Sequence, residues 1–212
     1  MHKEAAMSVH QVRSKPLSGA GWPDFIEELQ ACLQFLEVSS PQQGKLPAHQ
    51  GFSLWEEQAS RIKEEDRGVF FVGNGASSSM CSHFMTDIGK NGGLRTQMFG
   101  DAALLTALGN DIAFDQVFAE PLRRHARSGD MLVAISSSGN SPNIVEAAAA
   151  AREKELWIIT LTGMKPDNRL RSLGDLNFWV NAGSYGMVET AHAAILHYWT
   201  DCLVARHGGC HE

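Results

Sequence analysis

Short runs of apolar residues alternate along most of the chain with longer segments in which apolar residues recur every three or four positions. Runs such as Gly68–Val72 are typical of buried strands, and the segments between them have the period of helices. This order predicts a parallel sheet with right-handed crossovers and helices on both faces. The expected strands are 68–72, 95–99, 131–135, 156–161 and 176–180, and the expected helices are 77–90, 102–108, 111–126, 142–154, 168–173 and 187–206.

The segment before residue 67 has a different pattern. Helical periodicity runs from Trp22 to Leu36 and again from Phe52 to Glu65, and residues 39–51 between them contain prolines and a glycine. A pair of helices cannot bury its apolar faces alone, so we expect it to dock on the main domain or on another subunit. The predicted organisation is a flexible tail (1–21), a helical hairpin (22–66) and an α/β domain (67–212).

Composition and charge narrow the class of protein. Hydrophobic residues make up 43% and charged residues 20% of the 212 residues, which predicts a folded core. The net charge of −6 disfavours a nucleic-acid footprint. The densest basic stretch, residues 123–127, is short, and we expect His125 within it to lie on the surface.

The cysteines show no Cys-x-x-Cys spacing, and no apolar run has the length of a signal peptide core or a membrane span. A cytoplasmic protein with no membrane partner is expected.

A serine-rich loop between the strand at 131–135 and the next helix predicts an anion site. Ser141 is a natural N-cap, and Pro142 is a natural first helical residue. The free backbone N–H groups and the positive end of the helix dipole therefore face the loop, beside several hydroxyl groups. An ordinary capped turn needs fewer polar residues, so we predict binding of a phosphate monoester by Ser136, Ser137, Ser138 and Ser141.

Two further loops are candidates for the same site. Residues 74–77 (Asn74, Gly75, Ala76, Ser77) join a buried strand to a helix, and the glycine lets the backbone approach a ligand closely. Asn110 and Asp111 precede the helix that we expect to start near residue 112, where Asp111 is alternatively an N-cap. Neither loop matches a Walker phosphate loop or a dinucleotide fingerprint, so no nucleotide cofactor is expected.

Four ionisable residues on two predicted helices form a candidate acid–base set. His83 and Asp87 are four residues apart and share a helix face, whereas Glu189 and His197 are eight apart, or about 80° around the axis. His192 points elsewhere, about 140° from His197. Such a set can transfer protons or bind a divalent metal, zinc included. Each residue alone is better explained as a polar group on a helix surface, and the set gains weight only if it shares a site with the phosphate loops.

Together these segments resemble the sugar isomerase (SIS) domain superfamily, and within it the phosphoheptose isomerases. The resemblance covers about residues 68–203, with a matching helical hairpin before it. It implies a flavodoxin-like three-layer sandwich with a five-stranded parallel sheet, a homotetramer, and a site at the subunit interface. The matching segments are 73–77, 83–84, 109–111, 135–141 and 159–163, and Glu189, His192 and His197 in the closing helix.

The resemblance also implies an activity and a role for each matching residue. The expected enzyme is an aldose–ketose isomerase that converts sedoheptulose 7-phosphate into a D-glycero-D-manno-heptose 7-phosphate type product through a cis-enediol. The family's catalytic pair corresponds to Asp87 and His197, and Glu189 is a candidate to share their work. Zinc, in members that carry it, is bound at the positions of His83, Asp87, Glu189 and His197. The substrate-binding positions correspond to Asn74, Gly75, Ala76, Asn110, Asp111, Ser136, Ser137, Ser138 and Ser141.

The chain departs from the family pattern at three places. Asp87 replaces a glutamate, Glu189 replaces a glutamine, and Gly186-Met187 replaces an acidic–basic pair beside the substrate. The more anionic set favours a divalent cation, whereas the changed edge leaves the sugar open. Two alternatives therefore stay open: a non-catalytic phosphosugar sensor or adaptor, and an isomerase or epimerase of another phosphosugar. Retention of a carboxylate and a histidine favours catalysis.

Overall fold

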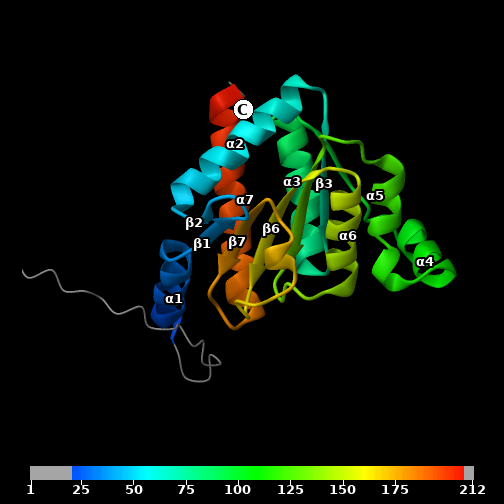
Figure 1. Cartoon of the computed structure of the whole chain (residues 1–212). Coiled ribbons are helices and arrows are strands. Elements are labelled where there is room, and N and C mark those ends of the chain that lie inside the picture. Colours follow the sequence, from blue (N-terminus) through cyan, green and yellow to red (C-terminus); the bar gives the residue numbers. More distant parts are fainter. Residues whose placement is uncertain (1–20, 208–212) are drawn as a thin grey trace, which may run out of the picture.

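A computed structural model describes residues 21–207 and shows a sheet covered by helices on both faces (Figure 1). The predicted tail lies outside the described residues except for Gly21, as does Cys210. The strands are β1 (Glu37–Ser40), β2 (Gly44–Leu46), β3 (Gly68–Gly73), β4 (Arg95–Met98), β5 (Met131–Ser136), β6 (Trp157–Gly163) and β7 (Leu176–Val180). The helices are α1 (Trp22–Gln34), α2 (Ala48–Glu64), α3 (Ala76–Lys90), α4 (Ala102–Asp111), α5 (Ala119–His125), α6 (Pro142–Glu153) and α7 (Tyr185–His207), with short 3₁₀ turns η1 (Phe114–Gln116) and η2 (Leu170–Ser172).

The sheet has its apolar side chains on both faces, as the strand patterns predict. Along β3, Val69 and Phe71 join the core under α1, α2, α3 and α7, whereas Phe70 and Val72 join the core under α5 and α6. Successive side chains of a strand point to opposite faces, so a strand buried on both sides reads as a continuous apolar run. The three-layer sandwich predicted from the sequence is confirmed.

The sheet has seven strands in the order β2-β1-β7-β6-β5-β3-β4, not the predicted five. The five predicted strands are parallel, and β1 and β2 are added antiparallel beyond β7. These extra strands come from the segment that the sequence indicated as a break between two helices. They are four and three residues long, too short for an alternating pattern to be recognised. Their buried residues, Val38 and Leu46, attach the helical region to the sheet.

The predicted helix over residues 111–126 is wrong. Helix α4 continues to Asp111, the turn η1 follows, and α5 begins at Ala119. Pro121 therefore lies in the first turn of α5, where proline breaks no intrahelical hydrogen bond. The proline marks the start of a separate helix.

The strand order reverses between β3 and β5. From β3 the chain passes outward to β4 through α3, and it then returns to β5 on the other side of β3. Helices α3 and α6 consequently lie on opposite faces of the sheet (Figure 1). In open α/β sheets, ligands bind beyond the carboxyl ends of the strands at such a reversal. The fold thus places a site where the loops after β3 and β5 meet.

Candidate active site

A hollow of about 260 Å³ lies at this reversal. Its walls come from the loop after β3, the loop after β5, and the first turns of α3 and α7. The sequence placed most of these residues in one site, and the structure brings them together. The lining residues are Asn74, Gly75, Ala76, Ser77, Ile135, Ser136, Ser137, Ser138, Ser141, Tyr185 and Glu189.

The serine loop is held in shape by bonds within itself. The Gly139 N–H donates to the Ser136 carbonyl oxygen at 3.0 Å and lies 3.2 Å from the Ser136 hydroxyl oxygen. Gly139 has a φ of +63°, and a Cβ there would collide with Asn168, so glycine is required. The Ser141 hydroxyl lies 3.3 Å from that of Ser136 and makes no capping bond. The Ile144 and Val145 N–H groups both donate to the Ser141 carbonyl oxygen, at 3.1 and 3.0 Å, and Pro142 has no N–H. The hydroxyl groups of the loop and the positive end of the α6 dipole therefore remain to face a ligand.

Helix α3 presents a second N-terminus to the hollow. It begins after Gly75, whose φ of +55° suits a residue without a Cβ. Helices of 15 and 12 residues, α3 and α6, thus direct the positive ends of their dipoles to one place. No lysine or arginine lines the hollow in the part of the chain that the structure describes. Backbone N–H groups, helix dipoles and hydroxyls are the groups here that can hold an anion.

The acid–base residues of α3 and α7 form a cluster beside the hollow. His83 Nε2 lies 3.3 Å from Asp87 Oδ2, which confirms that these two side chains share a face of α3. The ring centroids of His83 and His197 are 5.4 Å apart, and His197 packs edge-on against Phe84 at 4.7 Å. Both histidines are exposed, and Asp87 is partly exposed. The three side chains are open to a substrate from solvent.

Glu189 lies at a different level of α7 from His197. Eight residues along a helix correspond to about 12 Å of rise, and Glu189 lines the hollow, whereas His197 does not. The four residues that the family resemblance implies as zinc ligands therefore do not converge. Within residues 21–207, no group of three or more His, Cys, Asp or Glu side chains is placed to hold a metal ion. The predicted four-ligand set does not fit zinc in one copy of the chain.

His192 is fully buried between α7 and the sheet, away from His197 as predicted. Its Nε2 lies 3.1 Å from the Thr162 carbonyl oxygen at the end of β6. Nδ1 has no hydrogen-bond partner among the described residues. Burial lowers the pKa of His192 to about 4, and the bond to Thr162 opposes this effect only partly. His192 is therefore neutral at pH 7 and packs the start of α7 onto β6.

Asn110 and Asp111 lie apart from the hollow. They form the last residues of α4, not a loop before a helix, and the Asn110 amide donates to Asp111 Oδ1 at 2.8 Å. Both are exposed, and α4 lies at the end of the molecule remote from α7 (Figure 1). Neither residue lines the hollow of its own chain. Their predicted substrate contacts remain a prediction.

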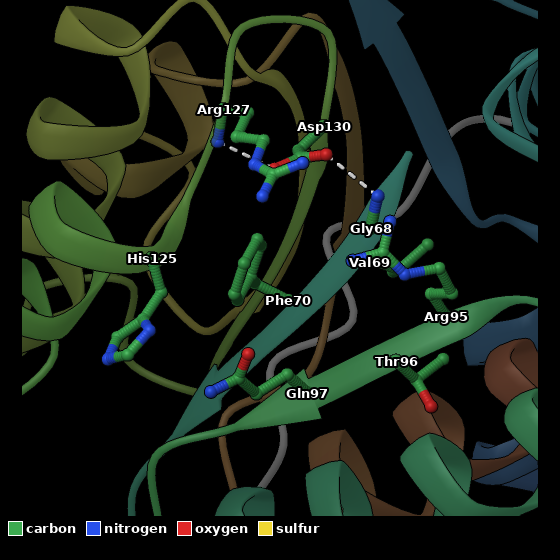
Figure 2. A pocket seen from close by; sticks show the side chains of 9 residues that line it. All are labelled: Gly68, Val69, Phe70, Arg95, Thr96, Gln97, His125, Arg127 and Asp130. Atoms are coloured by element: carbon green, nitrogen blue, oxygen red, sulfur yellow. Dashed lines mark hydrogen bonds between the residues drawn. The ribbon is translucent and has the colours of Figure 1, made fainter. Parts of the chain in front are cut away.

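A second hollow, of about 270 Å³, lies at the opposite edge of the sheet. Gly68 and Arg95 begin strands β3 and β4 there, and Asp130 immediately precedes β5. Figure 2 shows the Phe70 ring in the middle, with His125 on one side and Arg127 on the other. Asp130 already accepts hydrogen bonds from the N–H groups of Gly68 and Arg127, both at 2.7 Å. His125 is exposed, which confirms its predicted surface position, and it is remote from the serine loop.

Comparison with known proteins agrees with this geometry. The family model of the SIS domain matches residues 57–163. The phosphoheptose isomerase of Neisseria gonorrhoeae (strain NCCP11945) is 34% identical over 146 residues, which cover 65% of this chain and 74% of that protein. The phosphoheptose isomerase of Geobacter sp. (strain M21) is 32% identical over 186 residues, covering 84% and 95%. The solved structure of a phosphoheptose isomerase from Neisseria gonorrhoeae superimposes with a TM-score of 0.73 at 28% identity, covering 85% of this chain and 94% of that one.

The chain therefore belongs to the SIS domain family. Its relatives within the family are phosphoheptose isomerases that it matches over most of their length, which identifies it as an enzyme of the isomerase class. None of the helices in the described part of the chain is long and apolar enough to cross a membrane.

Proposed function

We propose that this enzyme interconverts sedoheptulose 7-phosphate and a D-glycero-D-manno-heptose 7-phosphate type aldose. The observation that carries the proposal is the hollow in which the N-termini of α3 and α6 meet the serine loop. The His83–Asp87–His197 cluster lies further along α3 and α7. The relatives named phosphoheptose isomerase support this choice of substrate. A hollow alone would support any phosphosugar.

In this proposal the phosphate lies in the serine loop. It accepts hydrogen bonds from the hydroxyls of Ser136, Ser138 and Ser141 and faces the positive end of the α6 dipole. Gly75, Ala76 and Ser77 at the start of α3 face the same oxygens. The carboxylate of Glu189 would repel a phosphate placed beside it, so it faces hydroxyl groups of the sugar.

The reactive carbons lie toward the acid–base cluster. His197 is about 12 Å further along α7 than Glu189, and His83 is about 10 Å beyond the start of α3. A phosphosugar must be long and extended to contact both the serine loop and this cluster. The open-chain form of a seven-carbon ketose phosphorylated at its far end satisfies that requirement, which supports a heptose over a shorter sugar.

Isomerisation then needs a proton transfer between C1 and C2. A base removes a proton from C1 of the ketose while O2 gains a proton, which gives the cis-enediol. Return of a proton to C2 with loss of the O1 proton gives the aldose. We assign the carbon-bound proton to one of Asp87 and His197 and the oxygen protons to the other, since both side chains lie in the exposed cluster.

No step of this mechanism passes through a zinc ion. Of the side chains that the resemblance implies as ligands, Glu189 lies apart from the His83–Asp87–His197 cluster, and the described residues form no group placed to hold a metal ion. His83 has another function in this scheme: its bond to Asp87 at 3.3 Å orients the carboxylate.

We further propose a homotetramer whose sites lie between subunits. Helix α1 carries an apolar face open to solvent, with Trp22 72% and Ile26 42% exposed, and such a face needs a partner. The protruding helix α4 carries Asn110 and Asp111 away from the chain's own hollow, so in this arrangement they contact substrate in a neighbour. We place the enzyme in the cytoplasm, in keeping with its free cysteines Cys32, Cys81 and Cys202.

A proton NMR time course in deuterated water tests the activity. Purified protein is incubated with sedoheptulose 7-phosphate, and we expect an aldose 7-phosphate that carries deuterium at C2. Under the same conditions, His197→Ala and Asp87→Asn should each lower turnover at least about 100-fold. His125→Ala, at the opposite edge of the sheet, is the matched control and should retain wild-type turnover. Phosphate binding without any conversion would instead favour the sensor or adaptor alternative.

Mixing two inactive variants tests the shared site. Asp111→Ala and His197→Ala affect residues that would come from different subunits of one site. Co-refolding them in equal amounts should restore a fraction of wild-type turnover, because some interfaces then combine two intact halves. The double variant Asp111→Ala/His197→Ala mixed with wild type serves as the control for subunit exchange. Complete inactivity of the mixture, with exchange demonstrated, would refute a site assembled from these two halves.

A further inference from the structure

Asn143 is a buried polar residue that the phosphate site and the acid–base cluster do not explain. It occupies the second position of α6, directly after Pro142, and is 2% exposed. Asparagine is unfavourable within helices because its amide competes for backbone hydrogen bonds. A buried amide also costs free energy unless its donors and acceptors are satisfied. A specific partner is therefore needed to account for an asparagine at this position.

That partner is Asn74, in the loop after β3. Asn143 Nδ2 donates to Asn74 Oδ1, and Asn74 Nδ2 donates to Asn143 Oδ1, both at 2.9 Å. Reversing either amide alone would place two oxygens and two nitrogens face to face, so the pair fixes both orientations. Each amide keeps a second N–H. Asn143 is buried, whereas Asn74 is exposed and lines the hollow, so the remaining N–H of Asn74 is the accessible one.

The amide pair crosses the point where the strand order reverses. Asn74 leads into α3 on one face of the sheet, and Asn143 begins α6 on the other. The two helices border the same hollow, and this pair links the loop that leads into α3 to the first turn of α6. A change in the pair would alter both the direction of the Asn74 amide and the spacing of the helix N-termini.

We propose that Asn143 is a positioning residue of the phosphosugar site: it holds the Asn74 amide so that its second N–H donates to the bound phosphosugar. This inference rests on the proposed function only in taking the hollow as the anion site. Asn143 itself does not touch the ligand. Its effect on binding must therefore pass through Asn74, which distinguishes it from a residue that merely stabilises α6.

A double-mutant cycle on the binding of inorganic phosphate tests this inference without requiring turnover. The dissociation constants of wild type, Asn74→Ala, Asn143→Ala and the double variant are measured by NMR titration of the full-length protein. Loss of one hydrogen bond to a charged ligand corresponds to about a tenfold rise in the dissociation constant. We expect about tenfold for each single variant and about the same tenfold for the double variant, because Asn143 acts through Asn74.

Asn177 supplies the matched control. It is also a buried asparagine, at 4% exposure, and its amide bonds Thr160 and Gly174 near the start of β7, away from the hollow. Asn177→Ala should lower the melting temperature and leave phosphate affinity unchanged. Asn143→Leu, which keeps a similar side-chain size, adds no charge and cannot bond Asn74, should reproduce the affinity loss if Asn143→Ala folds poorly.

Three results would overturn the inference. The first is an Asn143→Ala protein that behaves like Asn177→Ala, less stable with unchanged affinity. The second is a double variant in which the two single effects multiply to about 100-fold. The third is wild type that does not bind phosphate. Wild type that binds phosphate and shows the expected cycle, yet does not isomerise the heptulose, would remove the proposed function and leave the inference standing.

Discussion

Acid should destabilise this protein through one buried histidine. His192 is fully buried, and burial lowers its pKa to about 4, whereas a histidine in an unfolded chain titrates near 6.5. Between these two values the unfolded chain carries a proton on His192 that the folded protein excludes. The free energy of unfolding therefore falls as the pH drops from about 6.5 toward 4, and the contribution levels off below that.

The size of the effect follows from the two pKa values. A difference of one pKa unit corresponds to about 1.4 kcal/mol, so the shift of His192 to about 4 makes a contribution of about 3 kcal/mol. This contribution is fully present at pH 7 and lost by about pH 4. Against a typical stability of about 5–15 kcal/mol, such a loss is measurable.

Urea denaturation of wild type and His192→Gln at fixed protein concentration, from pH 7.5 to 4, measures this contribution. Glutamine can still donate to the Thr162 carbonyl oxygen but does not titrate. All other titrating groups are common to both proteins, so the difference between the two pH profiles isolates His192. We expect wild type to lose about 3 kcal/mol more than the variant over this range. Parallel pH profiles of the two proteins would show that His192 is protonated in the folded protein, or that the contact between α7 and β6 opens to water.

Three further predictions follow from the packing. Gly139→Ala should cost at least about 2 kcal/mol of stability and abolish phosphate binding, because a Cβ would collide with a neighbouring side chain. Gly186→Ala should be tolerated, because no atom lies within 4 Å of the added Cβ. Denaturation and phosphate titration of the two variants make this comparison. Trp55→Ala should destabilise by about 3–5 kcal/mol in urea unfolding, because Trp55 is fully buried and stacks on Trp199 at 4.0 Å. Cys202 should react with iodoacetamide well before Cys81 in the native protein, because burial raises the pKa of the Cys81 thiol far above its usual range. Peptide mapping of the labelled protein measures the two rates, and equal rates would contradict the buried position of Cys81.

The parallel core of the fold could be predicted from the sequence because its strands are buried on both faces. Segments such as Met131–Ile135 read as continuous apolar runs, and their order dictates the sandwich. Strands β1 and β2 escaped prediction for the opposite reason: they are short, each has a single large apolar residue, and β1 depends on pairing with β7, which is distant in the sequence. Local patterns carry no information on such tertiary pairing.

The two loops that line the hollow could also be recognised in the sequence, because glycine and serine at the start of a helix are local signals. The acid–base set was only partly predictable. A helical wheel places Glu189 and His197 about 80° apart but ignores the rise of about 12 Å between them, which separates the hollow from the His83–Asp87–His197 cluster. The four predicted ligands do not converge within the described residues because of that axial distance, which the residue numbers already contain, and zinc binding stays a prediction.

Residues that act through a partner are the hardest to find from a single sequence. Asn143 looks like one more polar residue at a helix start, and only its bonds to Asn74, 69 residues away, reveal that it joins two loops. The one local signal is an asparagine followed by the apolar and alanine-rich turns of α6, where a solvent-facing position is not expected. His192 is similar, because its partner is a backbone carbonyl of β6. Asn143 connects the start of α6 to the loop after β3, and His192 connects α7 to β6, so the spacing of the elements around the hollow depends on side chains that do not line it.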